Sequence, residues 1–159
     1  MVTIFDIIVA RALMDIMACY AVTIVLLTIC IMIGLAELPA RPLSLISAAL
    51  LMGWFTLGLT LIASCLTYRN ELWTRQIHVL SYLVIPISGA WFSMSNLPPS
   101  FRDVLQWFPM PLIFEQARYG QFQTSPGRFV SPAYVIGWCA VLTFAGLLFT
   151  RRIRAKVHG

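Results

Sequence analysis

A long apolar stretch without Asp, Glu, Lys or Arg covers residues 42–68 and reads PLSLISAALLMGWFTLGLTLIASCLTY. A helix needs about 20 predominantly apolar residues to cross the roughly 30 Å hydrocarbon core of a bilayer. The stretch therefore predicts a membrane-spanning helix at about residues 43–67. Three further charge-free runs, residues 16–36, 76–101 and 129–150, are also long enough to span.

The overall composition indicates the same class of protein. Of the 159 residues, 60% are apolar and 11% are charged, whereas a soluble domain carries about 25% charged residues. This balance excludes a soluble globular protein and an intrinsically disordered one. We expect an all-α integral membrane protein in which residues 1–159 form a single domain.

Four transmembrane helices are expected, at about residues 13–36, 43–67, 76–92 and 132–150. Arg11 and Asp15 interrupt the first apolar stretch, so we expect an uncleaved span there and no signal peptide. The third span is short and contains Pro86 and Gly89, which predicts a kinked helix. A polar hairpin, residues 68–75, is expected before it.

The segment at about residues 99–120 is expected to form a re-entrant helical hairpin on the outer face, between spans three and four. Its apolar run, residues 104–114, is too short to span and contains Pro109 and Pro111. Glu115 and Arg118 are three residues apart and can pair on one helix face. Gly120 is expected to end that helix as a C-terminal cap.

The basic residues predict the orientation, because Lys and Arg collect in cytoplasmic segments. With both termini cytoplasmic, the inner segments hold seven basic residues and the outer segments hold four. The inner residues are Arg11, Arg69, Arg75, Arg151, Arg152, Arg154 and Lys156, and the outer ones are Arg41, Arg102, Arg118 and Arg128. We therefore expect a multi-pass protein with both termini inside. The net charge of +5 reflects this orientation rather than nucleic-acid binding.

No motif for catalysis or for a cofactor is present. The sequence contains no phosphate-binding loop, no zinc-protease motif and no nucleophile elbow. The four cysteines lie inside apolar runs without metal-ligand spacing, and we interpret them as packing residues. We therefore expect no catalytic residues, no cofactor and no metal, and a protein that is not an enzyme.

Two groups of residues leave alternatives open. The aromatic residues, 13% of the chain, form either an aromatic belt at the membrane surface or a stacking surface for a sugar polymer. In the second case Gln106, Gln116, Gln121 and Gln123 are candidates to bind hydroxyl groups. The pair of Glu115 and Arg118 either holds the hairpin in place or contacts an anionic substrate.

Four motifs in residues 82–122 carry a resemblance to a known family. They are PISGA at residues 86–90, LPP at residues 97–99, the tryptophan–proline run at residues 107–111, and E-x-x-R-x-G-x-F at residues 115–122. Together they resemble the C-terminal part of ABC-2 type permeases, most closely the exporters of capsular polysaccharide and O-antigen. Asp6, Ala10, Arg11 and Asp15 resemble the entry to the third span of that family.

The resemblance implies a membrane subunit of an ATP-driven exporter in the bacterial inner membrane, moving a lipid-linked polysaccharide of the capsular type. Two permease copies would pair with two separate ATPase subunits, which hydrolyse the ATP. A family permease has six spans, an N-terminal amphipathic helix and a cytoplasmic coupling helix before span three. By this resemblance the chain would correspond to spans three to six of a truncated protein. The alternatives are an exporter of O-antigen or a teichoic-acid-type polymer, an ABC-2 exporter of drugs or lipids, and an inactive fragment.

The resemblance also implies a candidate site in the hairpin. An exit gate would be formed by Pro98, Pro99, Arg102, Trp107, Pro109, Pro111, Glu115, Arg118 and Gly120. The candidate aromatic residues for stacking on sugar are Trp91, Phe92, Trp107, Phe108 and Tyr119. The implied partners are the ATPase subunit, a second permease copy, the lipid-linked polysaccharide and membrane lipid, without nucleic acid.

Overall fold

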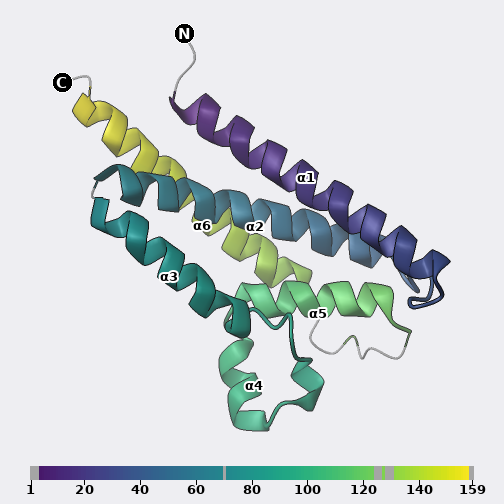
Figure 1. Cartoon of the computed structure of the whole chain (residues 1–159). Helices are drawn as coiled ribbons and strands as arrows, with labels where there is room; N and C mark the ends of the chain where they lie inside the picture. The colour runs from purple at the N-terminus through teal and green to yellow at the C-terminus, as the bar shows by residue number, and fades with distance from the viewer. Residues whose placement is uncertain (1–3, 70, 124–126, 128–130, 158–159) are drawn as a thin grey trace.

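A computed structural model describes residues 4–69, 71–123, 127 and 131–157. In this part of the chain every regular element is helical, as the composition predicts (Figure 1). The elements are α1 (Ile4–Met32), α2 (Pro42–Arg69), α3 (Glu71–Ile87), the short 3-10 helix η1 (Met94–Asn96), α4 (Pro99–Leu105), α5 (Pro109–Gln121) and α6 (Pro132–Val157).

Three of the described helices are long and apolar enough to cross a membrane: Val9–Met32, Pro42–Thr67 and Pro132–Arg151. The second and third agree with the predicted spans at residues 43–67 and 132–150. The first begins earlier than the predicted range of 13–36 and also ends earlier. Its helix ends because Gly34 adopts a φ of +78°, and the backbone amide of Leu35 then bonds to the carbonyl of Cys30 at 2.9 Å.

The third predicted span, residues 76–92, is wrong in its bounds. The helix α3 covers Glu71–Ile87, so the polar residues 71–75 expected in a hairpin are helical and residues 88–92 are not. The helix ends before Gly89, whose φ of +80° is incompatible with a right-handed helix. Its 17 residues extend over about 26 Å at 1.5 Å per residue. This helix is shorter than the three candidate spans.

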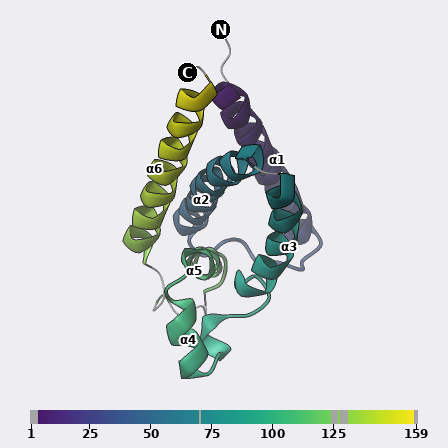
Figure 2. The ribbon, with the colours of Figure 1, turned by 90° about the vertical axis from the view of Figure 1, so that its left-hand side faces the viewer.

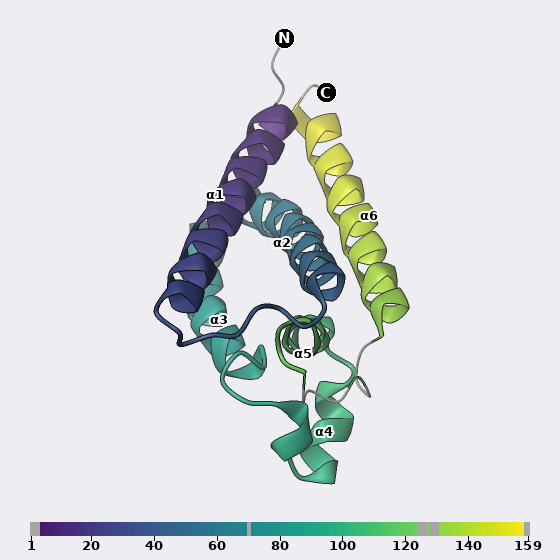
Figure 3. The same ribbon diagram turned by 90° about the vertical axis from the view of Figure 1, so that its right-hand side faces the viewer.

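The arrangement of the helices places the two ends of the chain together. The start of α1 and the end of α6 lie at one end of the molecule, and α4 lies at the opposite end (Figures 1 and 2). The helix α2 lies between α1 and α6 (Figure 3), and its most extensive contacts are with α6 and α5. The helix α2 is therefore the centre of the fold.

The core lies where α2, α5, α6 and η1 meet. Its buried side chains are Ala48, Leu51, Phe55, Met94, Leu112, Ile113, Val135 and Cys139. Glycines allow α2 and α6 to approach closely, since a Cβ atom at Gly146 would lie 2.8 Å from the Cβ atom of Leu61. Such small residues are typical of helix contacts in membranes. In contrast, α1 leaves most of its apolar side chains exposed, as expected for a surface that faces lipid or another membrane helix.

Two helices occupy the segment in which the sequence predicts a hairpin. The helix α4 begins at Pro99, and α5 begins at Pro109 after a short turn. Proline is favoured in the first turn of a helix because the missing N–H has no partner there in any case. The prolines of this segment therefore start helices.

Candidate functional site

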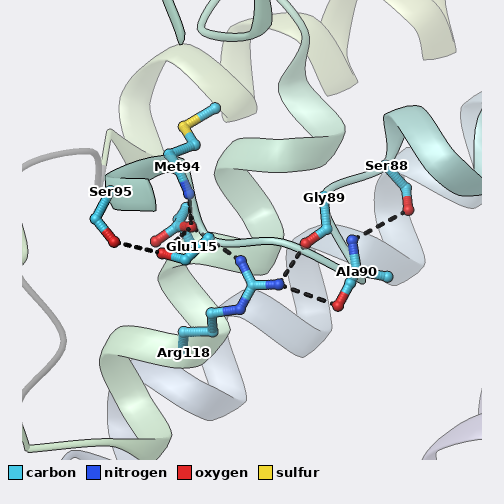
Figure 4. A network of polar contacts seen from close by, with 8 residues as sticks. Ser88, Gly89, Ala90, Met94, Ser95, Glu115 and Arg118 are labelled. Atoms are coloured by element: carbon cyan, nitrogen blue, oxygen red, sulfur yellow. Dashed lines mark hydrogen bonds and ion pairs between the residues drawn. The ribbon is translucent and has the colours of Figure 1, made fainter. Parts of the chain in front are cut away.

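A buried carboxylate is the centre of the candidate site. Glu115, on α5, is 2% exposed, and its Oε1 atom accepts three hydrogen bonds (Figure 4). The donors are the hydroxyl of Ser93 at 3.0 Å, the backbone amide of Met94 at 2.7 Å and Nη1 of Arg118 at 2.9 Å. The ion pair expected from the spacing of Glu115 and Arg118 is therefore present. Charge-assisted bonds of this kind are the strong ones in proteins.

The guanidinium group of Arg118 extends the network to the end of α3. Its Nη2 atom donates to the carbonyl oxygens of Gly89 and Ala90, the latter at 3.1 Å (Figure 4). In a non-helical segment these carbonyls have no helical partners, so an arginine side chain satisfies them. Glu115 and Arg118 together bind α5 to residues 89–94.

The glycine of the PISGA motif has a physical role at this point. Gly89 has a φ of +80°, a conformation that side chains with a Cβ atom disfavour. A Cβ atom there would also lie 3.2 Å from the Cα atom of Pro111. The neighbouring Ser88 donates its hydroxyl to the carbonyl of Ile85 at 2.6 Å. Gly89 therefore permits both the sharp end of α3 and the close approach of its own backbone to Pro111 of α5.

The opposite side of α5 is bound to α2 and to the segment before it. Gln116 is 4% exposed, and its Nε2 atom donates to the hydroxyl of Ser47 at 2.7 Å. The side-chain amide of Gln121 donates to the carbonyl of Glu37 at 2.8 Å. These two glutamines, considered above as partners for sugar hydroxyls, are thus bonded within the chain.

The prediction that Gly120 caps α5 is wrong. The helix continues to Gln121, and the amide of Phe122 bonds to the carbonyl of Arg118 at 2.8 Å. Instead, a Cβ atom at Gly120 would lie 2.6 Å from the backbone nitrogen of Leu45. The physical reason for a glycine is the close approach of the two backbones, which sequence spacing alone does not reveal.

Arg41 is a site residue that the sequence analysis placed only as an outer loop cation. Its backbone amide donates to the carbonyl of Gly120 at 2.9 Å, and its Nη1 atom donates to the carbonyl of Tyr119 at 3.1 Å. Its guanidinium carbon lies 4.1 Å from the centre of the Tyr119 ring, a cation–π contact. Arg41 therefore caps the C-terminal end of α5. An arginine between two prolines gave no signal for this role.

The candidate sugar-stacking residues lie in three different places. Trp91 and Phe92 follow α3, Trp107 and Phe108 lie between α4 and α5, and Tyr119 lies on α5. Trp91 is 81% exposed and Trp107 is 74% exposed, whereas the ring of Tyr119 is in contact with Arg41. Phe108 is also exposed, as is Phe101 on α4. The two tryptophans therefore share the exposed aromatic surface of this segment with two phenylalanines.

The remaining gate candidates divide between exposed and buried positions. Pro98 and Pro99 are exposed at the start of α4, while Pro109 and Pro111 are buried in the first turn of α5. Arg102, on α4, donates from Nη2 to the carbonyl of Leu97 at 2.9 Å. Within the described residues, no three His, Cys, Asp or Glu side chains lie close enough to hold a metal ion.

The described fold defines a class of protein: three apolar helices of spanning length make the chain a multi-pass integral membrane protein. The chain is 31% identical, over 157 residues and 99% of its length, to the capsule polysaccharide export inner-membrane protein CtrC of Neisseria meningitidis serogroup B. It is 28% identical to the protein of the same name from serogroup A and 27% identical to the capsule polysaccharide export inner-membrane protein BexB of Haemophilus influenzae.

This similarity extends over nearly the whole chain, which is therefore homologous to these capsule polysaccharide export proteins. The resemblance to exporters of capsular polysaccharide, which the four sequence motifs indicated, is therefore confirmed. The chain spans 59% of the length of each of these relatives. No family model matches the sequence.

Proposed function

We propose that this chain is part of the membrane subunit of an ATP-driven exporter that moves a lipid-linked polysaccharide of the capsular type across the inner membrane. The observation that carries this proposal is the similarity, over 99% of the chain, to inner-membrane proteins of capsule polysaccharide export. Transport is driven by a separate ATPase subunit, and a second permease copy completes the pathway. The substrate and membrane lipid are the other partners, and the subunit itself catalyses no reaction.

The proposed topology has four spans with both termini in the cytoplasm, and α3 is the third of them, in addition to the three helices of spanning length. Its support is the course of the chain: α3 leads from the end where α2 finishes to the end that carries α4 (Figure 1). An even number of crossings also agrees with the positions of the two ends of the chain. The start of α1 and the end of α6 lie at the same end of the molecule (Figure 2). Local thinning of the bilayer accommodates a helix as short as α3 at modest cost.

The α4–α5 hairpin forms the outer-face, re-entrant gate at the exit of the pathway in this proposal. Irregular backbone at membrane depth persists only where protein or a water-filled cavity surrounds it. The irregular residues before α4 meet this condition, because Arg118 binds the carbonyls of Gly89 and Ala90 and Glu115 binds the amide of Met94. The exposed Trp91 and Trp107 then offer flat apolar surfaces to sugar rings.

Deletion of the gene tests the proposal directly. Cells that lack it are expected to lose surface capsule, measured by staining of intact cells with a capsule-specific antibody, and re-expression restores the signal. Unchanged capsule on the deletion strain would refute the proposal. Loss of O-antigen or of a teichoic-acid-type polymer in place of capsule would identify one of the alternative substrates.

A further inference from the structure

The segment that joins α1 to α2, residues 33–41, carries exposed leucines at a membrane surface. The candidate spans Val9–Met32 and Pro42–Thr67 lie on its two sides, so the segment is at the level of the lipid headgroups when both helices cross the membrane. Three leucines within and beside it are highly exposed: Leu35 at 78%, Leu38 at 75% and Leu43 at 79%. Contact with acyl chains is favourable for such side chains, whereas contact with water is not.

The backbone of this segment is fixed by α5. The side-chain amide of Gln121 donates to the carbonyl of Glu37 at 2.8 Å. The backbone amide of Arg41 donates to the carbonyl of Gly120 at 2.9 Å. Figure 3 shows the segment passing beside the end of α5. Its side chains are therefore presented from a backbone that is held at two points.

The side chain of Arg41 is held in place, and most of its donors remain available. Its Nη1 atom donates to the carbonyl of Tyr119 at 3.1 Å, and its guanidinium carbon lies 4.1 Å from the centre of the Tyr119 ring. A guanidinium group has five N–H donors, and within the described part of the chain Arg41 has no carboxylate partner. Arginine binds phosphate groups strongly, because two parallel N–H donors match two phosphate oxygens. The exposed edge of Arg41 is therefore suited to a phosphate.

Glu37 adds a charge of opposite sign four positions earlier in the same segment. Its side chain is exposed, and it forms no ion pair with Arg41. The two charges and the leucines beside them match a molecule that has a phosphate, a cationic N–H donor and acyl chains. A free phosphate lacks the chains, and an anionic lipid lacks the cation. A phospholipid with an ammonium headgroup has all three.

We propose that residues 35–43 form a binding site for a phospholipid with a primary ammonium headgroup, of the phosphatidylethanolamine type. The guanidinium group of Arg41 binds the phosphate, the carboxylate of Glu37 accepts a hydrogen bond from the ammonium group, and the exposed leucines contact the acyl chains. The site goes beyond the proposed function, because it needs neither the polysaccharide nor the ATPase. The bound lipid adds to the contacts that hold this segment on α5.

Native mass spectrometry of the purified chain, with added lipids of identical acyl chains, tests the site without any export measurement. Phosphatidylethanolamine is expected to give at least about threefold more protein–lipid adduct than phosphatidylcholine, whose nitrogen has no N–H, or phosphatidylglycerol, which has no cation; the loss of one exposed ion pair changes a binding constant by this order. Equal adducts of the three lipids, or a preference for phosphatidylglycerol, would overturn the proposal. Since export is not measured, the site can fail while the proposed function stands.

Variants of the two charged residues test their separate roles. Glu37→Gln leaves the backbone carbonyl that binds Gln121 in place and is expected to abolish the preference for phosphatidylethanolamine over phosphatidylcholine. Asp103→Asn changes an exposed carboxylate of α4 and, as the matched control, is expected to keep the preference. Arg41→Gln is expected to reduce the adducts of all three lipids, because the phosphate contact is lost. If Arg41→Gln does not fold, Glu37→Gln decides: an unchanged preference in that variant would refute the site.

Discussion

The carboxylate of Glu115 accepts a 2.7 Å hydrogen bond from the backbone amide of Met94, a residue 21 positions earlier in the chain. Both residues are buried, and the bond joins α5 to the segment that follows α3. The same oxygen accepts from Ser93 and from Arg118. One side chain thus fixes the geometry at the start of the irregular segment that leads into α4.

Replacing this carboxylate is expected to destabilise the protein. In Glu115→Gln the charge opposite Arg118 is lost, and the new NH₂ group is placed among existing donors, at a cost of about 1–3 kcal/mol. The apparent melting temperature in detergent is expected to fall by several degrees. The control is Asp103→Asn, which changes an exposed carboxylate of α4. This substitution is expected to leave the melting temperature unaltered. Equal effects of the two substitutions would contradict the role assigned to Glu115.

A substitution at Gly89 tests the conformation that ends α3. Gly89→Ala forces a Cβ atom into the left-handed region at a φ of +80° and to within 3.2 Å of Pro111, which is expected to cost about 1–2 kcal/mol. At Gly137 a Cβ atom would have no neighbour within 4 Å. Gly137→Ala in α6 is therefore expected to be neutral or slightly stabilising. The melting temperatures of both variants, measured by thermal unfolding, test this expectation. An unchanged melting temperature in Gly89→Ala would be evidence against the described turn.

Gln116 tests the attachment of α5 to α2. Gln116→Leu removes the 2.7 Å hydrogen bond to the hydroxyl of Ser47, so we expect a loss of about 0.5–1.5 kcal/mol and reduced capsule export. The hydroxyl of Ser47 also donates to the carbonyl of Ser44 at 2.9 Å, so it stays bonded in this variant. The double substitution with Ser47→Ala is expected to cost less than the sum of the two single substitutions, because both remove the same bond. Gln123→Leu is the matched control, since Gln123 is exposed. If the costs of the two single substitutions simply add in the double variant, the pair has no energetic coupling.

A substitution at Trp107, the exposed tryptophan between α4 and α5, separates contact with sugar from anchoring in the membrane. Trp107→Leu keeps an apolar side chain but removes the aromatic face. We expect an unchanged melting temperature and surface capsule reduced at least about threefold, in line with the contribution of about 0.5–1.5 kcal/mol that an aromatic contact makes beyond its buried area. Phe144→Leu makes a similar change at an exposed residue of α6 and is expected to leave export unaltered. If the two variants export capsule equally well, Trp107 has no role in contacting sugar.

The sequence predicted those parts of the fold that depend on hydrophobicity alone. The helices predicted at residues 43–67 and 132–150 agree with the structure, because a long apolar run that begins at a proline and ends at arginines leaves few alternatives. The predicted bounds of α3 are wrong because residues 71–75, with the charged Glu71 and Arg75, are helical. Charged residues at the end of a span do not by themselves make a turn. The helix end at Gly34 depends on a single backbone angle, which composition does not report.

In the candidate site, only the local relationship could be predicted. Glu115 and Arg118 lie three residues apart, so helical geometry alone places them together. Ser93, Met94, Ser47 and Arg41 contact α5 from distant parts of the chain, and one sequence gives no signal for such contacts. Gly120 shows the same limit, because the backbone that excludes its side chain belongs to α2.

The location of the polymer tests the proposed export function most directly. Lipid-linked polysaccharide is quantified separately on the surface and inside the cells of the deletion strain and of the same strain after re-expression of the gene. We expect the deletion strain to accumulate the polymer inside and to carry little on its surface, with re-expression reversing both. Polymer that still reaches the surface of the deletion strain in normal amounts would contradict the account.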